Sequence, residues 1–215
     1  SSATYVAKDG LIKSTTGDTP RIDFSDSVKG ALLLENQSTN KITNFIPNSN
    51  WNIDNGAIVT ENYAISPDGT QNASRIQLDN SGSNTLTRIY SNFVPDSTND
   101  TASFYAKSNT ENSFNITFYL RNTGFGTVRG QKEITVTNEW QRFDLTADCS
   151  GASFVDLLIY NTTSNENWDF LMYGIQVEAL SYNTSVIPTF GSTATRLADV
   201  CNNSGSAQDL SLIHI

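Results

Sequence analysis

Histidine is nearly absent from this chain of 215 residues, since His214 is the only one. Ser–His–Asp and Cys–His sites need an imidazole as general base, so this scarcity argues against such catalysis. The two cysteines, Cys149 and Cys201, have no CxxC or other metal-ligand spacing, and a zinc site of the His and Cys type therefore lacks ligands. The cysteines could form one disulfide or remain two free thiols, and their spacing leaves both alternatives open.

Positive charge is also scarce. The chain has 13 Lys and Arg residues against 22 Asp and Glu residues, which gives a net charge of −9. This balance repels the phosphate backbone of nucleic acids and an anionic membrane surface, so we expect neither as a partner. No apolar run approaches the roughly 20 residues that span a bilayer, so membrane insertion is not expected. A glycine-rich loop ending in GK[ST], which would indicate nucleotide binding, is missing too.

The last six residues, 210–215, read LSLIHI. They resemble the in-frame translation of a transposase adapter used in sequencing libraries, with an ordinary apolar C-terminus as the alternative. We expect them to be adapter-derived, which would make the chain a metagenomic fragment. Without His214 the native segment would contain no histidine.

Apolar residues make up 37% of the chain and aromatic residues 10%, enough for a packed core. Charged residues are only 16%, whereas Asn, Ser and Thr are abundant. Such neutral polar surfaces are typical of secreted, cell-surface or virion β proteins. We therefore expect a virion or extracellular location.

Short alternating segments separated by turns dominate the chain. In residues 113–121 (SFNITFYLR), Phe114, Ile116, Phe118 and Leu120 share one face of a predicted strand. The predicted strands are 57–63, 74–78, 85–92, 101–107, 113–121, 131–137, 141–146, 154–161 and 170–178. With no convincing amphipathic helix, this pattern predicts an all-β fold, an antiparallel β-sandwich of the jelly-roll type.

The pattern also divides the chain. Residues 1–48 predict an extended, hairpin-like lead-in with little room for a core of its own. Residues 49–190 predict the jelly-roll β-sandwich. Residues 191–215 predict a C-terminal linker or exit segment.

Several motifs carry a resemblance to known proteins. Residues 50–51 (NW), 65–70 (ISPDGT), 140–143 (WQRF) and 173–178 (YGIQVE) resemble conserved pieces of carbohydrate-binding-module-like, galactose-binding-like jelly rolls. Residues 20–24 (PRIDF), 31–42 (ALLLENQSTNKI) and 182–200 (YNTSVIPTFGSTATRLADV) resemble a module of bacteriophage tail-fibre and spike proteins. The resemblance spans nearly all of residues 9–200.

The resemblance implies a non-enzymatic virion structural module of a fibre or spike, which binds or presents host-surface glycans. Fibres of this kind are usually homotrimers, so partner chains would cover apolar residues 32–34. The alternative is a carbohydrate-binding module that tethers a polysaccharide-degrading enzyme to its substrate. Tail or capsid genes beside this one would favour the first function, and glycosidase genes the second.

Acidic residues offer two further kinds of chemistry. Glycoside hydrolysis needs two carboxylates, but nothing in the pattern marks a pair, and solvated strand edges are the simpler interpretation. The acids concerned are Glu133, Glu139, Asp144, Asp156, Asp169 and Glu178. The function requires no cofactor, although a structural calcium ion held by loop oxygens is compatible with the resemblance. No contiguous acidic loop identifies its ligands, so the metal site stays unassigned.

A β-sandwich binds a glycan or cell-surface polysaccharide with aromatic rings and polar groups that point away from its core. Alternation places such groups on one face of three predicted strands. If these strands are neighbours, they form a single ligand-binding face made of Arg88, Tyr90, Tyr105, Lys107, Tyr119 and Arg121. An ordinary solvent face or a subunit interface is the competing interpretation. The three tryptophans, Trp51, Trp140 and Trp168, are expected to pack in the core.

Overall fold

The structure is a computed structural model that describes residues 3–17, 19–81, 86–95, 98–163 and 165–200. These residues form β-strands and contain no helix. Accordingly, no helix within the described ranges is long and apolar enough to cross a bilayer. The predicted all-β class is confirmed.

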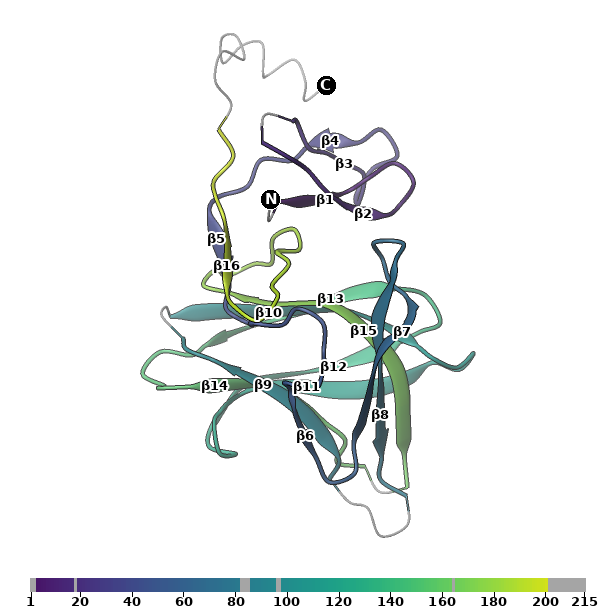
Figure 1. The fold of residues 1–215 in the computed structure, drawn as a ribbon. Helices are drawn as coiled ribbons and strands as arrows, with labels where there is room; N and C mark the ends of the chain where they lie inside the picture. The colour runs from purple at the N-terminus through teal and green to yellow at the C-terminus, as the bar shows by residue number, and fades with distance from the viewer. Residues whose placement is uncertain (1–2, 18, 82–85, 96–97, 164, 201–215) are drawn as a thin grey trace.

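Two five-stranded antiparallel sheets lie face to face (Figure 1). The first sheet contains, in spatial order, β13 (Gln141–Asp148), β10 (Asn99–Ser108), β15 (Asn167–Glu178), β8 (Gln71–Asp79) and β7 (Ile58–Ile65). The second contains β12 (Val128–Val136), β11 (Phe114–Asn122), β14 (Val155–Tyr160), β9 (Arg88–Phe93) and β6 (Asn52–Asp54). This is the predicted antiparallel β-sandwich, with strands close in sequence exchanged between the two sheets as in a jelly roll.

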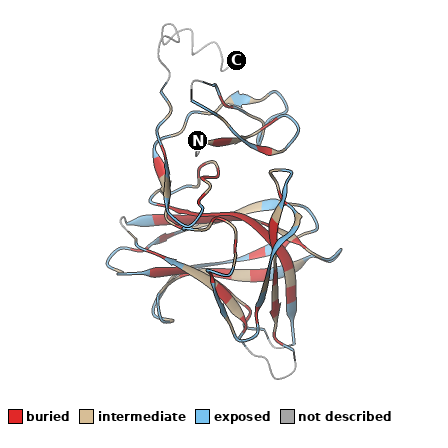
Figure 2. Ribbon diagram, in the orientation of Figure 1, coloured by how far each residue is buried: buried red, intermediate tan, exposed pale blue. Residues whose placement is uncertain are grey.

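Alternation along the strands explains how the sheets meet. In β11, Ile116, Phe118 and Leu120 are fully buried between the sheets. Phe118 contacts Phe104 of β10 edge to face across the core, at 4.9 Å between ring centroids. Figure 2 shows buried residues distributed along the strands of both sheets. The strand pattern of residues 113–121 therefore predicted the core face correctly.

The tryptophans divide between core and rim. Trp51 and Trp168 are buried in the core between the sheets, as expected. Trp140 is only half-buried and packs against a smaller cluster outside the first sheet. Cys149 is buried in the main core as a free thiol.

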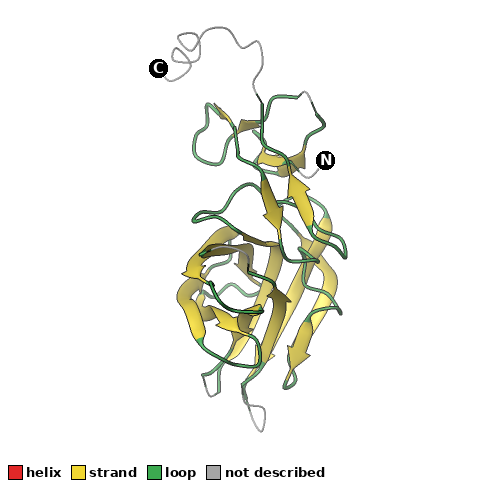
Figure 3. Cartoon of the chain, turned by 90° about the vertical axis from the view of Figure 1, so that its left-hand side faces the viewer, coloured by secondary structure: helices red, strands yellow, loops and turns green. Residues whose placement is uncertain are grey.

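The remaining strands form three small pairs on the outer side of the first sheet (Figures 1 and 3). The pairs are β1 (Thr4–Val6) with β2 (Ile12–Ser14), β3 (Ile22–Asp23) with β4 (Ala31–Leu32), and β5 (Ser38–Asn40) with β16 (Ala194–Arg196). The last pair joins the lead-in to the exit segment. The chain therefore enters and leaves the sandwich side by side.

The lead-in has a hydrophobic contact with the outer face of the first sheet rather than a core of its own. Ile12 and Phe45 cluster with Tyr173 of β15 and with Val186, and all four are buried. Asn40 completes this contact, since its side-chain amide donates to the carbonyl oxygens of Ile175 and Ile187 at 3.0 Å each. The lead-in therefore packs directly against the sandwich.

Buried charges fix the same junction, in a cluster that we call the junction network: Arg21, Glu35, Arg196 and Asp199. The side chains of Arg21 and Arg196 are each 2% exposed. Glu35 Oε2 lies 2.6 Å from Arg21 Nη1 and 3.2 Å from Arg196 Nη1. Asp199 pairs with Arg21 as well. Lead-in and exit segments are therefore held together by ion pairs removed from solvent.

All nine strands predicted from the pattern are present, with end points shifted by a few residues. The pattern did not predict β5, β6 or β16, each three residues long, whereas the predicted hairpin-like lead-in contains the antiparallel pairs β1–β2 and β3–β4. The unit boundaries at residues 48 and 190 stay predictions. Cys201, His214 and the LSLIHI tail lie outside the described residues.

Candidate functional site

Four of the six predicted ligand-binding residues lie together on the outer face of the second sheet. Tyr90 of β9 and Tyr119 of β11 both pair with Leu158 of β14, so the three form one row across the sheet. The two tyrosines are two strand spacings apart, about 10 Å. Arg88 and Arg121 lie one row away on either side.

The inner residues of these strands show why the row points outward. Ile89, Phe118 and Ile159 are each at most 1% exposed and belong to the core. Their neighbours along each strand must project to the opposite face of the sheet. Tyr90 and Tyr119 are half-buried there.

Further rings join this row. Tyr160, which pairs with Arg88 in the β14–β9 register, is a third tyrosine on the face. Phe125 comes from the loop between β11 and β12 and lies edge to face with Tyr90 at 6.2 Å. We call the following set the tyrosine face: Arg88, Tyr90, Tyr119, Arg121, Phe125, Leu158 and Tyr160. Leu158 is only 1% exposed although it lies on the outer side of the sheet, so the surrounding side chains cover it.

The two arginines hold the Phe125 loop over the sheet. Arg121 Nε donates to the Gly126 carbonyl at 2.9 Å, and its Nη2 donates to the Phe125 carbonyl at 2.5 Å. The Arg88 guanidinium lies 3.8 Å from the centroid of the Phe125 ring, a cation–π contact. Arg88 is in turn paired with Asp54, with 2.8 Å between Nη2 and Oδ2. The loop-borne ring is therefore fixed from two sides.

Phe125 adopts a left-handed backbone conformation with φ of 59°. Bulky residues rarely do so, because Cβ crowds the carbonyl oxygen. Such strain persists only where the surroundings impose it, and it concentrates at functional sites. Gly124 and Gly126 indicate a loop in the sequence. Nothing in the sequence indicates that Phe125 turns back onto the sheet.

The phenol groups of Tyr90 and Tyr119 stay neutral at physiological pH. Burial raises the pKa of both Tyr90 and Tyr119 above 10. Each hydroxyl can therefore donate and accept hydrogen bonds. Gln131 and Asn52 flank the row at its two ends, since they pair with Tyr119 and Tyr90. The face thus offers rings in the middle and neutral polar groups at the edges.

Asp156, which pairs with Arg121, carries an ionisable group below this surface. The residue is 3% exposed, and burial raises the pKa of its carboxyl above 3.8. The hydrogen bond from Thr123 and the charge of Arg121 offset this only in part. At neutral pH the buried Asp156 carboxyl is ionised, which lowers the free energy of unfolding. This loss of stability disappears as pH falls through the raised pKa towards 3.8.

We expect Asp156→Asn to be more stable than the parent protein at neutral pH, with the difference vanishing below pH 3.8. Urea unfolding of the parent protein and the variant at neutral pH and below pH 3.8 measures the difference in stability. Asp148 is the matched control, because the hydrogen bond from Ser150 lowers the pKa of its carboxyl. Asp148→Asn should therefore lose stability at neutral pH. A less stable Asp156→Asn at neutral pH would contradict the assignment.

The other two predicted residues, Tyr105 and Lys107, do not join this face. Both belong to β10 and therefore lie on the outer side of the first sheet. The expectation of one six-residue face is wrong, because β9 and β11 flank β14 in one sheet while β10 lies in the other. Sequence alternation distinguishes inner from outer residues but does not assign strands to sheets.

Tyr105 and Lys107 line a groove of about 870 Å³ between the first sheet and the lead-in. Trp140 also lines it, together with Arg142, whose guanidinium lies 5.5 Å from the centroid of Tyr105. Burial raises the pKa of the Tyr105 phenol. The groove is a second concave surface, separate from the tyrosine face.

Two of the candidate catalytic carboxylates, Asp169 and Glu178, are already engaged in structural contacts. Asp169 forms two hydrogen bonds with Arg75, at 2.9 and 2.5 Å. Glu178 is fully buried and accepts from Ser38 and Gln176 at 2.7 Å each. Across the described part of the chain, no three Asp, Glu, His or Cys side chains are grouped so as to hold a metal ion. Amide and carbonyl oxygens also bind calcium, so the calcium site stays a prediction.

Comparisons with known proteins concern the fold. No protein-family model matches the chain, and no curated protein does. Similar solved structures include the xylan-binding CBM22-1 domain of Xyn10C from Paenibacillus barcinonensis (TM-score 0.48, 13% identity, 68% of this chain and 94% of that one). They also include the family 11 carbohydrate-binding module of Clostridium thermocellum, solved with a mixed-linked β-1,3-1,4 tetrasaccharide (0.44, 13%, 71% and 97%).

A third similar structure is the enzymatically active domain of tailspike protein 4 of bacteriophage CBA120 (TM-score 0.47, 14% identity). The match covers 64% of this chain but spans only 21% of the tailspike chain. At these identities the likeness describes the sandwich and does not extend to ligands.

Proposed function

We propose that this chain is a non-catalytic glycan-binding module and that its tyrosine face holds the saccharide. The observation that carries the proposal is the row of Tyr90, Leu158 and Tyr119, with Tyr160 and Phe125 beside it. Sugar rings present apolar C–H faces and a rim of hydroxyls. Half-buried aromatic rings supply matching apolar area, and the phenol, amide and guanidinium groups around them supply hydrogen bonds.

The way in which the face is built supports this role. The tyrosines project from three adjacent strands, so their backbones are rigidly spaced before a ligand arrives. The strained Phe125 loop is held by Arg88 and Arg121, which makes it a fixed edge of the face. Preorganised rings lose little conformational entropy on binding.

We further propose that the module belongs to a virion fibre or spike and serves attachment to host-surface glycans. The paired β5 and β16 suit a module inserted in a longer chain, because both segments leave the sandwich on the outer side of the first sheet. Leu34 is 54% exposed on the lead-in and offers apolar area to partner chains of a homotrimer. A module that tethers an enzyme to polysaccharide would use the same face, and neighbouring genes distinguish the two contexts.

The experiment is a glycan array probed with the fluorescently labelled protein and three variants. We expect the parent protein to bind a subset of glycans and Tyr119→Ala to bind them roughly tenfold more weakly, because one stacking ring is lost. Tyr119→Phe should retain most of the affinity. Tyr182→Ala is the matched control, since Tyr182 is 48% exposed and lies outside the tyrosine face.

Equal binding by the parent protein and Tyr119→Ala would show that the saccharide binds outside the tyrosine face. Absence of binding to every glycan on the array would count against the function itself. Light scattering separately tests the homotrimer, which a monodisperse monomer would contradict.

A further inference from the structure

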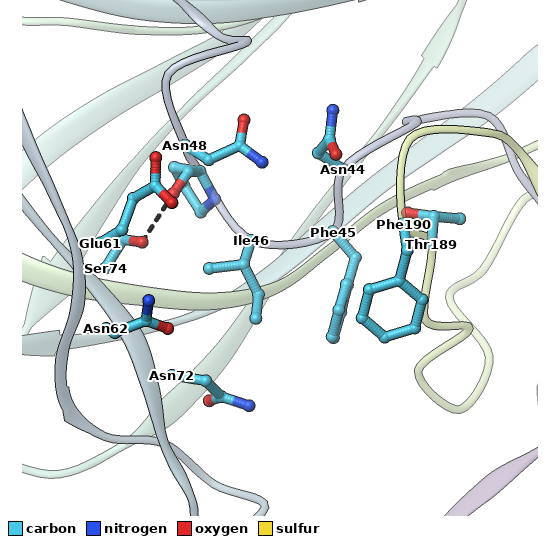
Figure 4. Close-up of a pocket in the computed structure, with 11 residues that line it drawn as sticks. Asn44, Phe45, Ile46, Asn48, Glu61, Asn62, Asn72, Ser74, Thr189 and Phe190 are labelled. Carbon is cyan, nitrogen blue, oxygen red and sulfur yellow. Dashed lines mark hydrogen bonds between the residues drawn. The ribbon is translucent and has the colours of Figure 1, made fainter.

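A small pocket lies between the loop after β5, strands β7 and β8 of the first sheet, and the segment between β15 and β16 (Figure 4). Its volume is about 150 Å³. The loop after β5 supplies Asn44 and Asn48, β7 and β8 supply Asn62 and Asn72, and the segment between β15 and β16 supplies Phe190. We call it the amide pocket, because four carboxamides line it.

The pocket has one aromatic wall that is open to solvent. Phe190 is 82% exposed, and its ring contacts Phe45 edge to face at 5.3 Å. Phe45 is buried and contacts Tyr173 in the same manner at 5.4 Å. The backbone around Phe190 is pinned as well, since Gly191 N donates to the Thr43 carbonyl at 2.8 Å. Phe190 is therefore an exposed ring held in place by a buried one.

Two polar side-chain atoms without hydrogen-bond partners lie beside the pocket. Thr189 is 2% exposed and its hydroxyl has no hydrogen-bond partner in the described structure. Asn72 Nδ2 donates to Asp68 Oδ2 at 2.9 Å, which orients the amide and leaves its buried Oδ1 without a partner. Buried polar atoms are nearly always paired with protein, water or ligand. The two atoms become available to a polar ligand once their side chains rotate.

Further hydrogen bonds hold the Asp68 carboxylate that orients Asn72. The Asp68 carboxylate also accepts from Thr70 Oγ1 at 2.7 Å and from the Tyr173 hydroxyl at 3.1 Å. Burial raises the pKa of this carboxyl, but the hydrogen bonds from Thr70 and Asn72 outweigh it and lower the pKa overall. The carboxylate thus stays ionised and holds the Asn72 amide by a charge-assisted hydrogen bond.

A bulge in β7 turns a further amide towards the pocket. The pairing of β7 with β8 shifts register between Thr60 and Ala64, and Asn62 within the bulge has φ of 52°. Bulges commonly redirect side chains in this way. The Asn62 amide has no hydrogen bond to the described residues and is shown beside the pocket in Figure 4. It is available to a ligand as both donor and acceptor.

The lining defines the class of ligand. No Lys or Arg is among the lining residues, and Glu61 already accepts from Ser49 N at 2.9 Å, so an anionic ligand is disfavoured. The volume lies well below the roughly 300–1,000 Å³ of drug-sized sites. An exposed ring beside neutral amides suits one sugar ring that stacks by its C–H face and hydrogen-bonds by its hydroxyls.

We propose that the amide pocket binds the terminal residue of a neutral glycan, as a second saccharide site independent of the tyrosine face. Phe190 stacks on the sugar ring, and Asn62, Asn72 and Thr189 hydrogen-bond its hydroxyls after small side-chain rotations. The two sites lie on different sheets, so the chain can engage two parts of a branched glycan or two neighbouring glycans. Such bivalence raises avidity without new contacts.

The test uses ¹⁵N-labelled protein titrated with the methyl glycosides of glucose, galactose, mannose and N-acetylglucosamine. At least one of them should shift the side-chain amide resonances of Asn62 and Asn72 saturably, in the millimolar range expected for so small a ligand. Phe190→Ala should weaken this binding about tenfold, and Asn62→Asp should also weaken it. Phe190→Ala should leave the thermal midpoint unchanged, because the ring is exposed.

Tyr119→Ala separates this inference from the proposed function. Binding in the amide pocket should persist in that variant even where array binding is lost. No saturable shift with any of the four glycosides would overturn the proposal. So would shifts that remain equally strong in Phe190→Ala, or an altered oligomeric state of that variant without sugar binding, which would assign Phe190 to contact between copies.

Discussion

Replacement of Glu35 by alanine should lower the free energy of unfolding by about 3–5 kcal/mol, as expected when one partner of a buried ion pair is removed. This is a large fraction of the roughly 5–15 kcal/mol by which domains are stable. The reason is that Glu35 faces both Arg21 and Arg196, each only 2% exposed. Asp199 remains beside Arg21 in the variant, whereas Arg196 loses its ion-pair partner.

Hydrogen bonds add to this effect. The Glu35 carboxylate accepts from Ser185 N and from Ser185 Oγ, each at 2.7 Å. Arg196 retains neutral acceptors, the Thr184 hydroxyl at 2.9 Å and the Asn36 carbonyl at 2.7 Å. These do not neutralise its charge. Burial already lowers the pKa of Arg196, which shows how little solvent stabilises the cation.

Urea unfolding of the parent protein, Glu35→Ala and Glu35→Gln measures this effect. Glu35→Gln keeps hydrogen-bonding capacity without the charge, so its loss of stability should be smaller. Asp9→Ala is the matched control, because the Asp9–Lys13 pair is about half exposed and its loss should cost far less stability than the loss of Glu35. If Glu35→Ala were as stable as Asp9→Ala, the junction network would contribute nothing to the fold.

Replacement of Phe104 by alanine should cost a similar amount, about 3–5 kcal/mol, through lost burial and the cavity left behind. Phe104 is 0% exposed and lies at the centre of the sandwich. Its ring contacts Phe118 of the opposite sheet at 4.9 Å and Phe143 of the neighbouring strand at 6.2 Å. Both sheets therefore lose a contact in the same variant.

Chemical unfolding of Phe104→Ala and of Phe154→Ala provides the comparison. Phe154 is 49% exposed, so its truncation should change the stability by less than about 1 kcal/mol. Because Phe104 touches both sheets, its loss should shift the single unfolding transition without splitting it. Two separate transitions, or equal costs for the two variants, would contradict the view of one core shared by the sheets.

The sandwich itself could be predicted because its long strands obey a period of two. Residues 113–121 show this most clearly, since the alternation of Phe114 to Leu120 with polar residues fixes both the strand and its buried face. The small strands could not be predicted in this way. A strand of two residues such as β3 (Ile22–Asp23) has no period, and tertiary contacts alone establish it.

The junction network was missed for a different reason. Arg21, Glu35 and Arg196 look like ordinary surface charges in the sequence, because charged residues are rarely buried without partners. Their burial depends on contacts between residues separated by up to 178 positions, as for Arg21 and Asp199. No local sequence pattern can reveal a contact between residues so far apart in the chain.

Four of the six residues predicted for the candidate site lie together on one face. Alternation correctly gave the outward direction of Arg88, Tyr90, Tyr119 and Arg121, because it depends only on neighbouring residues. It could not show that β10 belongs to the other sheet, which carries Tyr105 away from the rest. Phe125 was missed because a loop residue has no strand partner from which to infer its direction.

Chemical-shift mapping tests the central claim most directly. The ¹⁵N-labelled protein is titrated with an oligosaccharide that it binds on the array, and the shifted resonances are placed on the structure. Glycan binding at the tyrosine face predicts shifts concentrated on β9, β11, β14 and residues 123–127. Shifts confined to the groove beside Tyr105 and Trp140, with the tyrosine face unchanged, would contradict it.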